Sequence, residues 1–380
     1  MRLLCVCLVV CLAPAFALPV CALDHVTLLR DGVPLQLRGR IVAQSPSGET
    51  AFLTEDQVLW VAAADEVASR RRDAEPFVPL DNDAIAARLL AEMPAGFRIH
   101  KTAHYVVCYN TTPAYAQWCG ALYERLYRGY FSFWKHQGLE LAEPAWPLVA
   151  LVFDDRSSYA RYARTELGDA TRSIIGYYSL HTNRVTMYDL TGFDGGGEVR
   201  TATSAAHVNQ ILSQPAAERT VATIVHEATH QLVYNSGLMQ RYAAVPLWLS
   251  EGLAVYFETP DLGSTHGWRE IGAVSSVSLA AFRESLAARA ADSLESLLGD
   301  DARLRDPRQA AVAYGEAWAL TYYLIRSRRE DFLAYLNALS QLPPLQPVSA
   351  DERFALFRSH FGRDVAALDG ELIRYTLRIR

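Results

Sequence analysis

Hydrophobic and polar residues alternate in three segments near the start of the chain, at 25–29, 35–42 and 57–61. A period of two places successive side chains on opposite faces of a β-strand. Turn-forming residues separate the segments, with Asp31-Gly32 after the first and a Ser- and Gly-containing stretch at 45–48. The pattern predicts a small β module at 23–66, followed at 67–96 by a charged, helix-compatible linker and a helix.

The period changes further along the chain. Apolar runs predict strands at 104–109 and 148–153, a helix at 113–136, and two strands within 174–188 that turn at 181–183. The glycine-rich stretch 192–209, which contains His207, is predicted to be a loop. After Pro246 almost every segment has the 3.6-residue period of helices. We therefore predict an α+β fold in which a mixed sheet and a mainly helical half form one domain at 97–380.

Composition restricts the expected partners. The chain has 380 residues, of which 51% are hydrophobic and 21% charged, so it can build at least one complete core. Its net charge of −6 and pI of about 5.9 leave no excess positive charge for a phosphate backbone. The tight basic run at 70–72 is followed at once by Asp73. Nucleic acid is therefore not an expected partner.

Residues 1–22 have the pattern of a secretory signal peptide. Arg2 precedes an apolar core at 3–12, and small residues precede two cleavage points, after Ala17 and after Ala22. The later point is preferred. Since no other apolar run is long enough to cross a bilayer, we expect a secreted or periplasmic protein without a stable membrane span.

The cleavage point also decides how many cysteines remain. Four of the six cysteines lie within the predicted signal peptide. Cleavage after Ala22 leaves Cys108 and Cys119, an even pair that could form one disulfide in an oxidising compartment. Cleavage after Ala17 leaves Cys21 as a third thiol.

The five residues 226–230 read H-E-A-T-H and lie within an apolar stripe of helical spacing. Two histidines four positions apart share one face of a helix, so His226 and His230 can bind one zinc ion. Zinc lowers the pKa of a bound water to about 7, and Glu227 is placed to take its proton and pass it to a leaving amine. The pentapeptide therefore predicts hydrolysis of peptide bonds. A buried helix whose histidines only form hydrogen bonds is the alternative.

A catalytic zinc ion normally has three protein ligands and keeps one position for water. The third candidate is Glu251, in a helix-like run between Pro246 and Pro260. An unpaired carboxylate among apolar neighbours is costly unless a cation compensates it. Gly252, next to it, would allow this second helix to approach the first one closely. Alternatively, Gly252 is a glycine that the helix merely tolerates, with no role in packing. The predicted cofactor is one zinc ion per chain.

These residues resemble the gluzincin metallopeptidases. The run 248–254, W-L-S-E-G-L-A, is similar to W-L-N-E-G-F-A of the aminopeptidase N type. After the β module, most of the chain also resembles a family of secreted bacterial proteins of unknown function, which has no settled substrate. The resemblance implies a gluzincin-like domain with His226, His230 and Glu251 as zinc ligands. Thermolysin-like members have an aspartate four residues after the glutamate ligand, where this chain has Val255, and Glu258 is a differently placed substitute.

The resemblance also implies an oxyanion donor. Aminopeptidases of this type use a tyrosine in a Y-E-K-G-x-A-L-x-x-Y-L pattern, and 314–324 is similar, which nominates Tyr314. A packing role for any one of 19 tyrosines is the alternative.

Extended substrates commonly pair with a sheet edge, which 176–180 or 184–188 could supply, although these segments could instead form an interior hairpin. No segment resembles the G-A-M-E-N sequence that grips a free amino terminus, so endopeptidase or specialised hydrolase action is favoured.

The sequence leaves two further hypotheses. One is a zinc-containing binding or wall-associated protein with little or no peptidase activity, in which the β module performs recognition. An intact Glu227 argues against it, because a structural metal site has no use for a base. The other is hydrolysis of a non-peptide amide or ester by the same residues.

Overall fold

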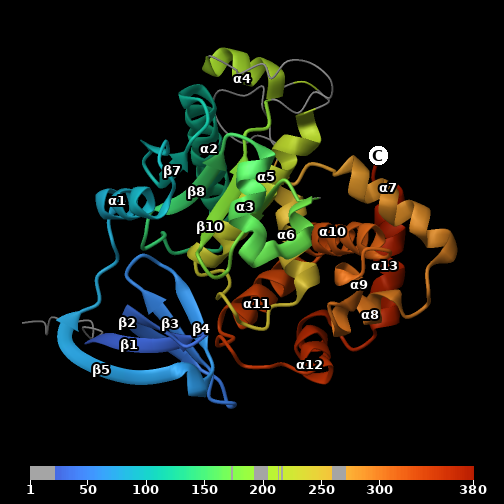
Figure 1. Cartoon of the computed structure of the whole chain (residues 1–380). Coiled ribbons are helices and arrows are strands. Elements are labelled where there is room, and N and C mark those ends of the chain that lie inside the picture. Colours follow the sequence, from blue (N-terminus) through green and yellow to red (C-terminus); the bar gives the residue numbers. More distant parts are fainter. Residues whose placement is uncertain (1–21, 173, 192–203, 213, 215–216, 259–270) are drawn as a thin grey trace, which may run out of the picture.

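The computed structural model describes residues 22–172, 174–191, 204–212, 214, 217–258 and 271–380. Two separate five-stranded sheets precede a largely helical C-terminal half, so the predicted α+β class is confirmed (Figure 1). The predicted signal peptide lies outside the described residues, except for Ala22. No helix in the described part of the chain is long and apolar enough to span a membrane.

The first sheet is the N-terminal β module, an antiparallel sheet with strand order β4-β3-β2-β1-β5. Its strands are β1 (Ala22–Arg30), β2 (Val33–Gln44), β3 (Thr50–Thr54), β4 (Leu59–Ala62) and β5 (Val67–Pro76). A 3-10 turn, η1 (Ala64–Glu66), joins β4 to β5. A positive φ of 52° at Asp31 and 76° at Gly32 forms the tight turn between β1 and β2, as their residue types predict.

The prediction of a helix-compatible linker at 67–96 is wrong for its first ten residues. Val67–Pro76 is β5, which pairs with β1 along the edge of the module. The charges that suggested a linker have a partner within the sheet, because Asp24 is only 1% exposed and its carboxylate lies 3.2 Å from Arg70 Nη2 and 2.9 Å from Arg72 Nε. A buried carboxylate requires such compensation. Two arginines of the basic run, Arg70 and Arg72, therefore form ion pairs within the module.

The second sheet has strand order β6-β7-β8-β10-β9. β7 and β10 run parallel to β8, while β6 and β9 are antiparallel edge strands. The strands are β6 (Arg98–Lys101), β7 (Tyr105–Tyr109), β8 (Leu148–Phe153), β9 (Gly176–Tyr178) and β10 (Arg184–Tyr188). Of the two predicted strands within 174–188, β9 is therefore an edge strand of the described sheet and β10 lies inside it.

Helices surround this sheet and form the C-terminal half (Figure 1). Around the sheet lie α1 (Asn82–Glu92), α2 (Pro113–Gln137), α3 (Arg156–Leu167), η2 (Gly168–Arg172), α4 (Ala205–Leu212) and α5 (Glu218–Asn235). The C-terminal half contains α6 (Leu247–Phe257), α7 (Ser276–Ser285), η4 (Leu286–Ala288), α8 (Ser293–Gly299), α9 (Ala302–Arg305), α10 (Ala310–Ser327), α11 (Arg329–Ser340), α12 (Ala350–Phe361) and α13 (Val365–Arg378). His207 lies on α4, not in a loop as predicted.

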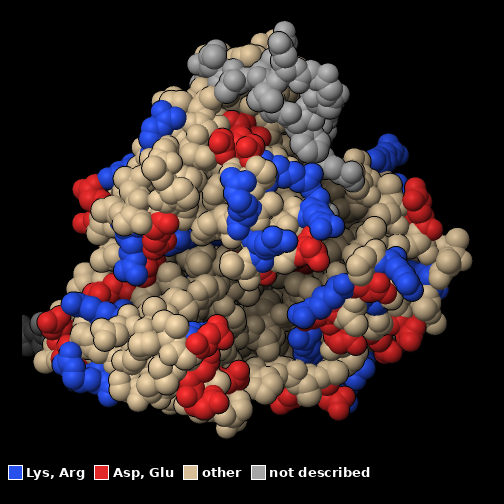
Figure 2. Space-filling view, in the orientation of Figure 1, with Lys and Arg blue, Asp and Glu red and all other residues tan. Residues whose placement is uncertain are grey.

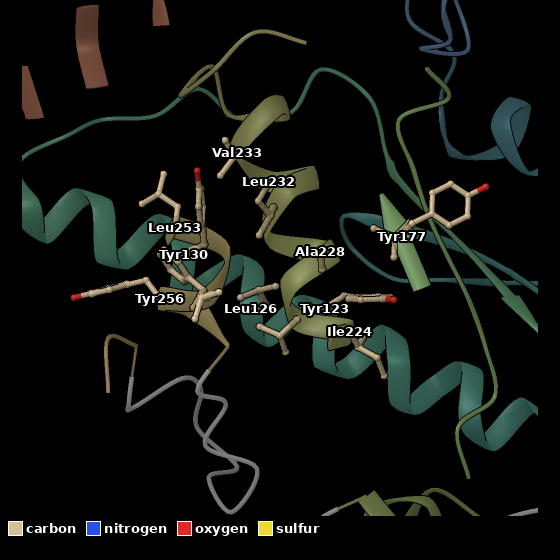
Figure 3. Close-up of a cluster of buried hydrophobic side chains, with 14 of the residues drawn as sticks. Tyr123, Leu126, Tyr130, Tyr177, Ile224, Ala228, Leu232, Val233, Leu253 and Tyr256 are labelled. Atoms are coloured by element: carbon tan, nitrogen blue, oxygen red, sulfur yellow. The ribbon is translucent and has the colours of Figure 1, made fainter. Parts of the chain in front are cut away.

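The apolar stripe of α5 is buried as predicted. Ile224, Ala228 and Leu232 are at most 2% exposed and face the aromatic-rich helix α2 (Figure 3). Burying each large apolar side chain stabilises the fold by about 1.5–3 kcal/mol. The packing of this stripe fixes the rotation of α5 about its own axis, which turns His226 and His230 away from α2.

Two glycines hold α10 close to its neighbours. A Cβ atom at Gly252 of α6 would lie 2.2 Å from Thr321 Oγ1 and 2.7 Å from the carbonyl oxygen of Ala317, both on α10. A Cβ atom at Gly315 of α10 would lie 3.0 Å from the carbonyl oxygen of Ser278 on α7. The close approach that Gly252 allows is thus to α10 and not to α5, which corrects the prediction.

A buried ion network anchors the first turns of α10. Glu316 is 1% exposed and binds Arg289 and Arg303, with Ser293 Oγ 3.1 Å from its carboxylate. Arg289 also pairs with Asp369 of α13. Removing one partner of such a network would leave a buried charge uncompensated. The network therefore links α10 to the segment that precedes α8, to α9 and to α13.

The two cysteines beyond the signal peptide are free thiols in the structure. Cys108 of β7 and Cys119 of α2 are both fully buried. Burial raises the pKa of the Cys108 thiol to about 12, and burial also raises the pKa of Cys119. The disulfide that the sequence allowed is therefore not formed here.

We predict that iodoacetamide at pH 8 leaves Cys108 and Cys119 unlabelled in the folded protein. A thiol with a pKa of about 12 is deprotonated in only about one molecule in ten thousand at this pH. After unfolding in guanidinium without a reductant, both should be labelled, which peptide mapping by mass spectrometry will detect. Labelling that requires a reductant would show a disulfide instead.

Candidate metal centre

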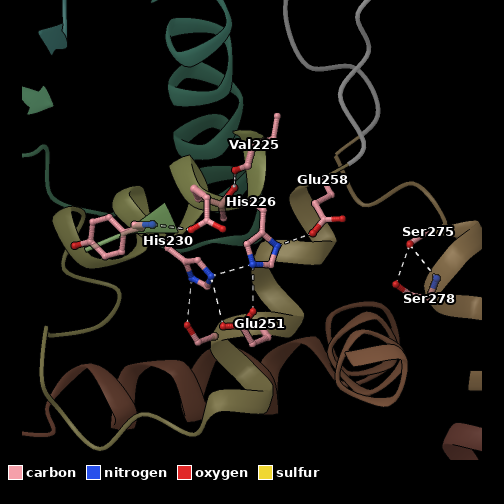
Figure 4. A network of polar contacts seen from close by, with 11 residues as sticks. Val225, His226, His230, Glu251, Glu258, Ser275 and Ser278 are labelled. Atoms are coloured by element: carbon pink, nitrogen blue, oxygen red, sulfur yellow. Dashed lines mark hydrogen bonds and ion pairs between the residues drawn. The ribbon is translucent and has the colours of Figure 1, made fainter. Parts of the chain in front are cut away.

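Helices α5 and α6 bring three potential metal ligands together (Figure 4). The Nε2 atoms of His226 and His230 lie 3.1 Å apart. Glu251 of α6 places Oε2 3.1 Å from His226 Nε2 and Oε1 3.5 Å from His230 Nε2. The three residues are 25 or fewer positions apart in the chain, and their ligand atoms lie within 4.8 Å of one another.

These separations fit a single metal ion. Tetrahedral zinc with bonds of about 2.0–2.1 Å to nitrogen and oxygen places its ligand atoms about 3.3 Å apart. The distance of 3.1 Å between the two histidine nitrogens, and the distances of 3.1 and 3.5 Å from these nitrogens to the two different oxygens of Glu251, are close to this value. Two imidazole nitrogens and one carboxylate also form a donor set that zinc accepts. His226, His230 and Glu251 could therefore hold one metal ion.

The other imidazole nitrogens have polar partners that orient both rings. His226 Nδ1 lies 2.5 Å from Glu258 Oε1, at the C-terminal end of α6, and donates its hydrogen to that carboxylate. His230 Nδ1 lies 3.3 Å from Ser250 Oγ. When Nδ1 carries the hydrogen, the lone pair is on Nε2, where a metal would bind. Glu258 thus occupies the supporting role for which the sequence nominated it, two helical turns after Glu251.

Burial and neighbouring charges shift the pKa values of the residues in this cluster. Glu251 is 8% exposed. Burial raises the pKa of its carboxyl, but His230 and His226 outweigh this effect and lower the pKa below the usual range. For His226, burial lowers the pKa, while the bonds to Glu251 and Glu258 raise it well above 6.5. The two carboxylates thus favour positive charge between them, which a protonated His226 or a bound cation could supply.

Glu227 is held at the edge of the second sheet. Its Oε2 accepts a hydrogen bond of 2.8 Å from the backbone N–H of Tyr178, the last residue of β9. Burial raises the pKa of Glu227, and His226 and His230 oppose that shift. The backbone bond fixes one carboxylate oxygen, so the base candidate has a defined position beside the ligand His226.

Tyr314 lies on the opposite side of the cluster, in the second turn of α10. Burial raises its pKa, and the negative charge of the nearby Glu251 carboxylate raises it further, so its hydroxyl stays protonated. Glu227 and Glu258 also raise this pKa by electrostatic repulsion. The tyrosine nominated by the sequence is therefore adjacent to the metal ligands. Tyr323, nine residues later, donates instead to Glu371.

The surface around α3 is locally basic. Arg156, Arg161 and Arg164 are exposed on α3, and Figure 2 shows Lys and Arg side chains gathered over this helix. The same view shows a hollow between this part of the molecule and the C-terminal helices. Exposed acidic residues such as Glu166 lie on the same helix. The positive charge on this face is therefore confined to a small area.

Two contacts at this centre were not predicted from the sequence. The sequence nominated 176–180 as a substrate edge, but not as the backbone that holds Glu227. It also gave no role to Ser250, although this residue directly precedes Glu251 and could have been tested as a partner for a histidine. Both contacts join segments that are distant along the chain.

Comparison with known proteins gives one family match. Residues 220–346 match the model of a family described as "Protein of unknown function (DUF1570)". The match covers about a third of the chain and contains His226, Glu227, His230, Glu251 and Tyr314. A search of curated proteins found no match. The findings therefore support a metal-binding cluster in a segment similar to a family of unknown function.

We predict that Glu258→Ala weakens zinc binding about 10–100-fold, the usual effect of losing the carboxylate that orients a histidine ligand. The variant also leaves Nδ1 of a buried imidazole without its acceptor. Zinc affinity is measured by competition with a chromogenic chelator. Glu284→Ala, on the exposed face of α7, is the control and should bind zinc like the wild type. An unchanged affinity in Glu258→Ala would contradict this role.

Proposed function

We propose that this protein is a zinc-dependent peptidase that acts outside the cytoplasm. The observation that carries the proposal is the cluster of His226, His230 and Glu251, whose potential ligand atoms lie within 4.8 Å of one another, with Glu227 fixed beside them by a backbone hydrogen bond. The location rests on the signal-peptide pattern of residues 1–22. The substrate would be a peptide or protein.

The residues of the site would divide the chemistry of hydrolysis. A bound zinc ion would polarise both a water molecule and the carbonyl group to be cleaved. Glu227 would take a proton from the attacking water and pass it to the leaving amine. Tyr314 would donate a hydrogen bond to the oxyanion that forms at the attacked carbonyl. Glu258 and Ser250 would hold the two histidine rings in place.

The position of the base favours hydrolysis over other metal chemistry. Two histidines and one carboxylate with open positions also suit Fe(II). Glu227, however, occupies a fixed position next to the cluster, and hydrolysis has a direct use for a carboxylate there. A binding or wall-associated protein would not need this group. A closed structural site can be distinguished from a catalytic one because a hydroxamate displaces water only from the latter.

The edge strand β9 suggests how a peptide would be placed. Its outer side is free of any strand in the described sheet, and Tyr178 brings this edge to Glu227. A peptide added to a sheet edge is held by its backbone, with its bonds close to groups on that edge. An ester or a non-peptide amide would gain less from this edge, which favours peptides among the substrates considered.

We expect Glu227→Gln to abolish hydrolysis and retain zinc, because it keeps the shape and the Tyr178 contact but removes the base. Glu251→Ala should lose both zinc and hydrolysis. Metal content is measured by mass spectrometry, and activity by digestion of a proteomic peptide library. Full hydrolysis by Glu227→Gln would overturn the mechanism, and unchanged zinc in Glu251→Ala would overturn the ligand assignment. Iron in place of zinc in the wild type would contradict the proposed cofactor.

Tyr314→Phe should lower kcat about 10²–10³-fold, the typical effect of removing one oxyanion donor. KM and zinc content should change little, because the ligand residues and the edge strand are retained. Tyr323→Phe is the matched control on the same helix, since its hydroxyl binds Glu371. Equal kcat values for the two variants would exclude Tyr314 from this role.

A further inference from the structure

We propose that the N-terminal β module is a positioning element of the metal centre and that its Gln57 acts through Asn183 to fix the β9–β10 hairpin, which holds Glu227. The catalytic part of this inference rests on the proposed function. The module would then be an integral part of the hydrolase body and not a separate recognition domain. Gln57 lies in the turn between β3 and β4, where Figure 1 shows the module facing the second sheet.

Asn183 is the centre of a buried polar network. This residue, 1% exposed, forms the turn between β9 and β10 and has a positive φ of 61°, which asparagine tolerates well. Its Nδ2 donates to Gln57 Oε1 at 2.6 Å and to Asn235 Oδ1 at 2.8 Å. Its Oδ1 accepts from Tyr178 Oη at 2.6 Å and from Asn235 Nδ2 at 2.8 Å. One side chain thus connects the module, the edge strand and α5.

The network reaches α5 on both sides of His230. The backbone N–H of Tyr178 donates to Glu227, which directly follows His226. The ring of Tyr178 stacks on the ring of Tyr234, with centroids 5.8 Å apart. Gln231, which follows His230, donates to the carbonyl oxygen of Asn183 at 2.8 Å. The hairpin is therefore fastened to the helix that carries both histidines and the base.

The module also holds the backbone of this hairpin. Leu59 N–H of β4 donates to the carbonyl oxygen of His181 at 2.8 Å. Arg241 donates to the carbonyl oxygens of Leu180 at 3.0 Å and Gln57 at 2.9 Å, so one guanidinium bridges the hairpin and the module. Gln57 itself donates to the carbonyl oxygen of Pro147, next to β8. These bonds occupy the chain beyond Tyr178, which confines a substrate to the short edge of β9.

The hairpin needs such support because β9 has only three residues and, among the described strands, pairs only with β10. A short edge strand opens more readily than the centre of a sheet. Gln57 is 1% exposed, so water can replace its amide oxygen as an acceptor only if the interface between the module and the hairpin opens. Removing this acceptor should loosen the hairpin, and with it the N–H group that orients Glu227. The ligands on α5 and α6 should remain in place.

The test compares the full-length wild type with Gln57→Met, which keeps the side-chain length but removes the amide. Gln36→Met is the matched control, because Gln36 lies exposed on β2 of the same module. The first measurement is hydrogen–deuterium exchange of segment 176–184. The second is kcat and KM on a peptide substrate, together with zinc content and a thermal midpoint to ensure that all proteins are folded at the assay temperature.

In Gln57→Met we expect about tenfold faster exchange of this segment and about tenfold lower kcat, with zinc content unchanged. Gln36→Met should match the wild type in every measurement. Unchanged exchange in Gln57→Met would overturn the inference, whether or not the protein is a peptidase. Faster exchange with wild-type kcat would overturn the positioning of Glu227. Faster exchange in Gln57→Met, together with a wild type that cleaves no peptide, would support the coupling of module and hairpin while rejecting the proposed function.

A double variant provides a second check. Tyr178→Phe removes the hydroxyl that binds Asn183 but leaves the ring and the backbone N–H. If Gln57 and Tyr178 act through the same amide, the loss of kcat in the double variant should be about that of the larger single loss. If the kcat losses of the two single variants instead multiply in the double variant, the two residues act independently, which would contradict the proposed route.

Discussion

The burial of the Glu251 carboxylate is the constraint on which the rest of the centre depends. Helix α6 is buried along nearly its whole length, so this group, which is 8% exposed, has little access to bulk water. Removing a carboxylate from water costs several kcal/mol unless positive charge and hydrogen bonds replace its hydration. His226 and His230 meet this requirement from α5, with a metal ion as the natural third component. The packing of α5 against α2 and of α6 against α10 keeps these groups at the required distances.

The centre lies between two bodies that meet it from opposite sides. On one side, Gly252 and Gly315 let α10 approach closely, and the Glu251 carboxylate is near enough to raise the pKa of Tyr314. On the other side, the edge of the second sheet reaches Glu227 through Tyr178. The helical half therefore supplies a candidate metal ligand and a hydroxyl, while the sheet positions the candidate base. A hydrolytic site requires both, since a misplaced base or oxyanion donor costs orders of magnitude in rate.

Local periodicity predicted most elements because it depends on the same residues that form them. The strand at 148–153 and the helix at 113–137 agree with the predicted ranges within one residue. β5 was mistaken for a linker because its charges are neutralised by Asp24 on another strand, and a local pattern contains no information about such a partner. α4 was mistaken for a loop because the glycines before it dominated the interpretation of residues 192–209.

The sequence by itself determined the metal-ligand candidates, the base and the class of fold. Spacing on a helix is local, so His226 and His230 converge for any stable α5, and a carboxylate in an apolar run such as that of Glu251 already implies a cation. Only the tertiary structure decided that Glu258 orients His226, that Tyr178 holds Glu227, that Gly252 faces α10, and that Gln57 of the β module reaches Asn183. Each of these contacts depends on how separate elements pack, which no local pattern of residues encodes.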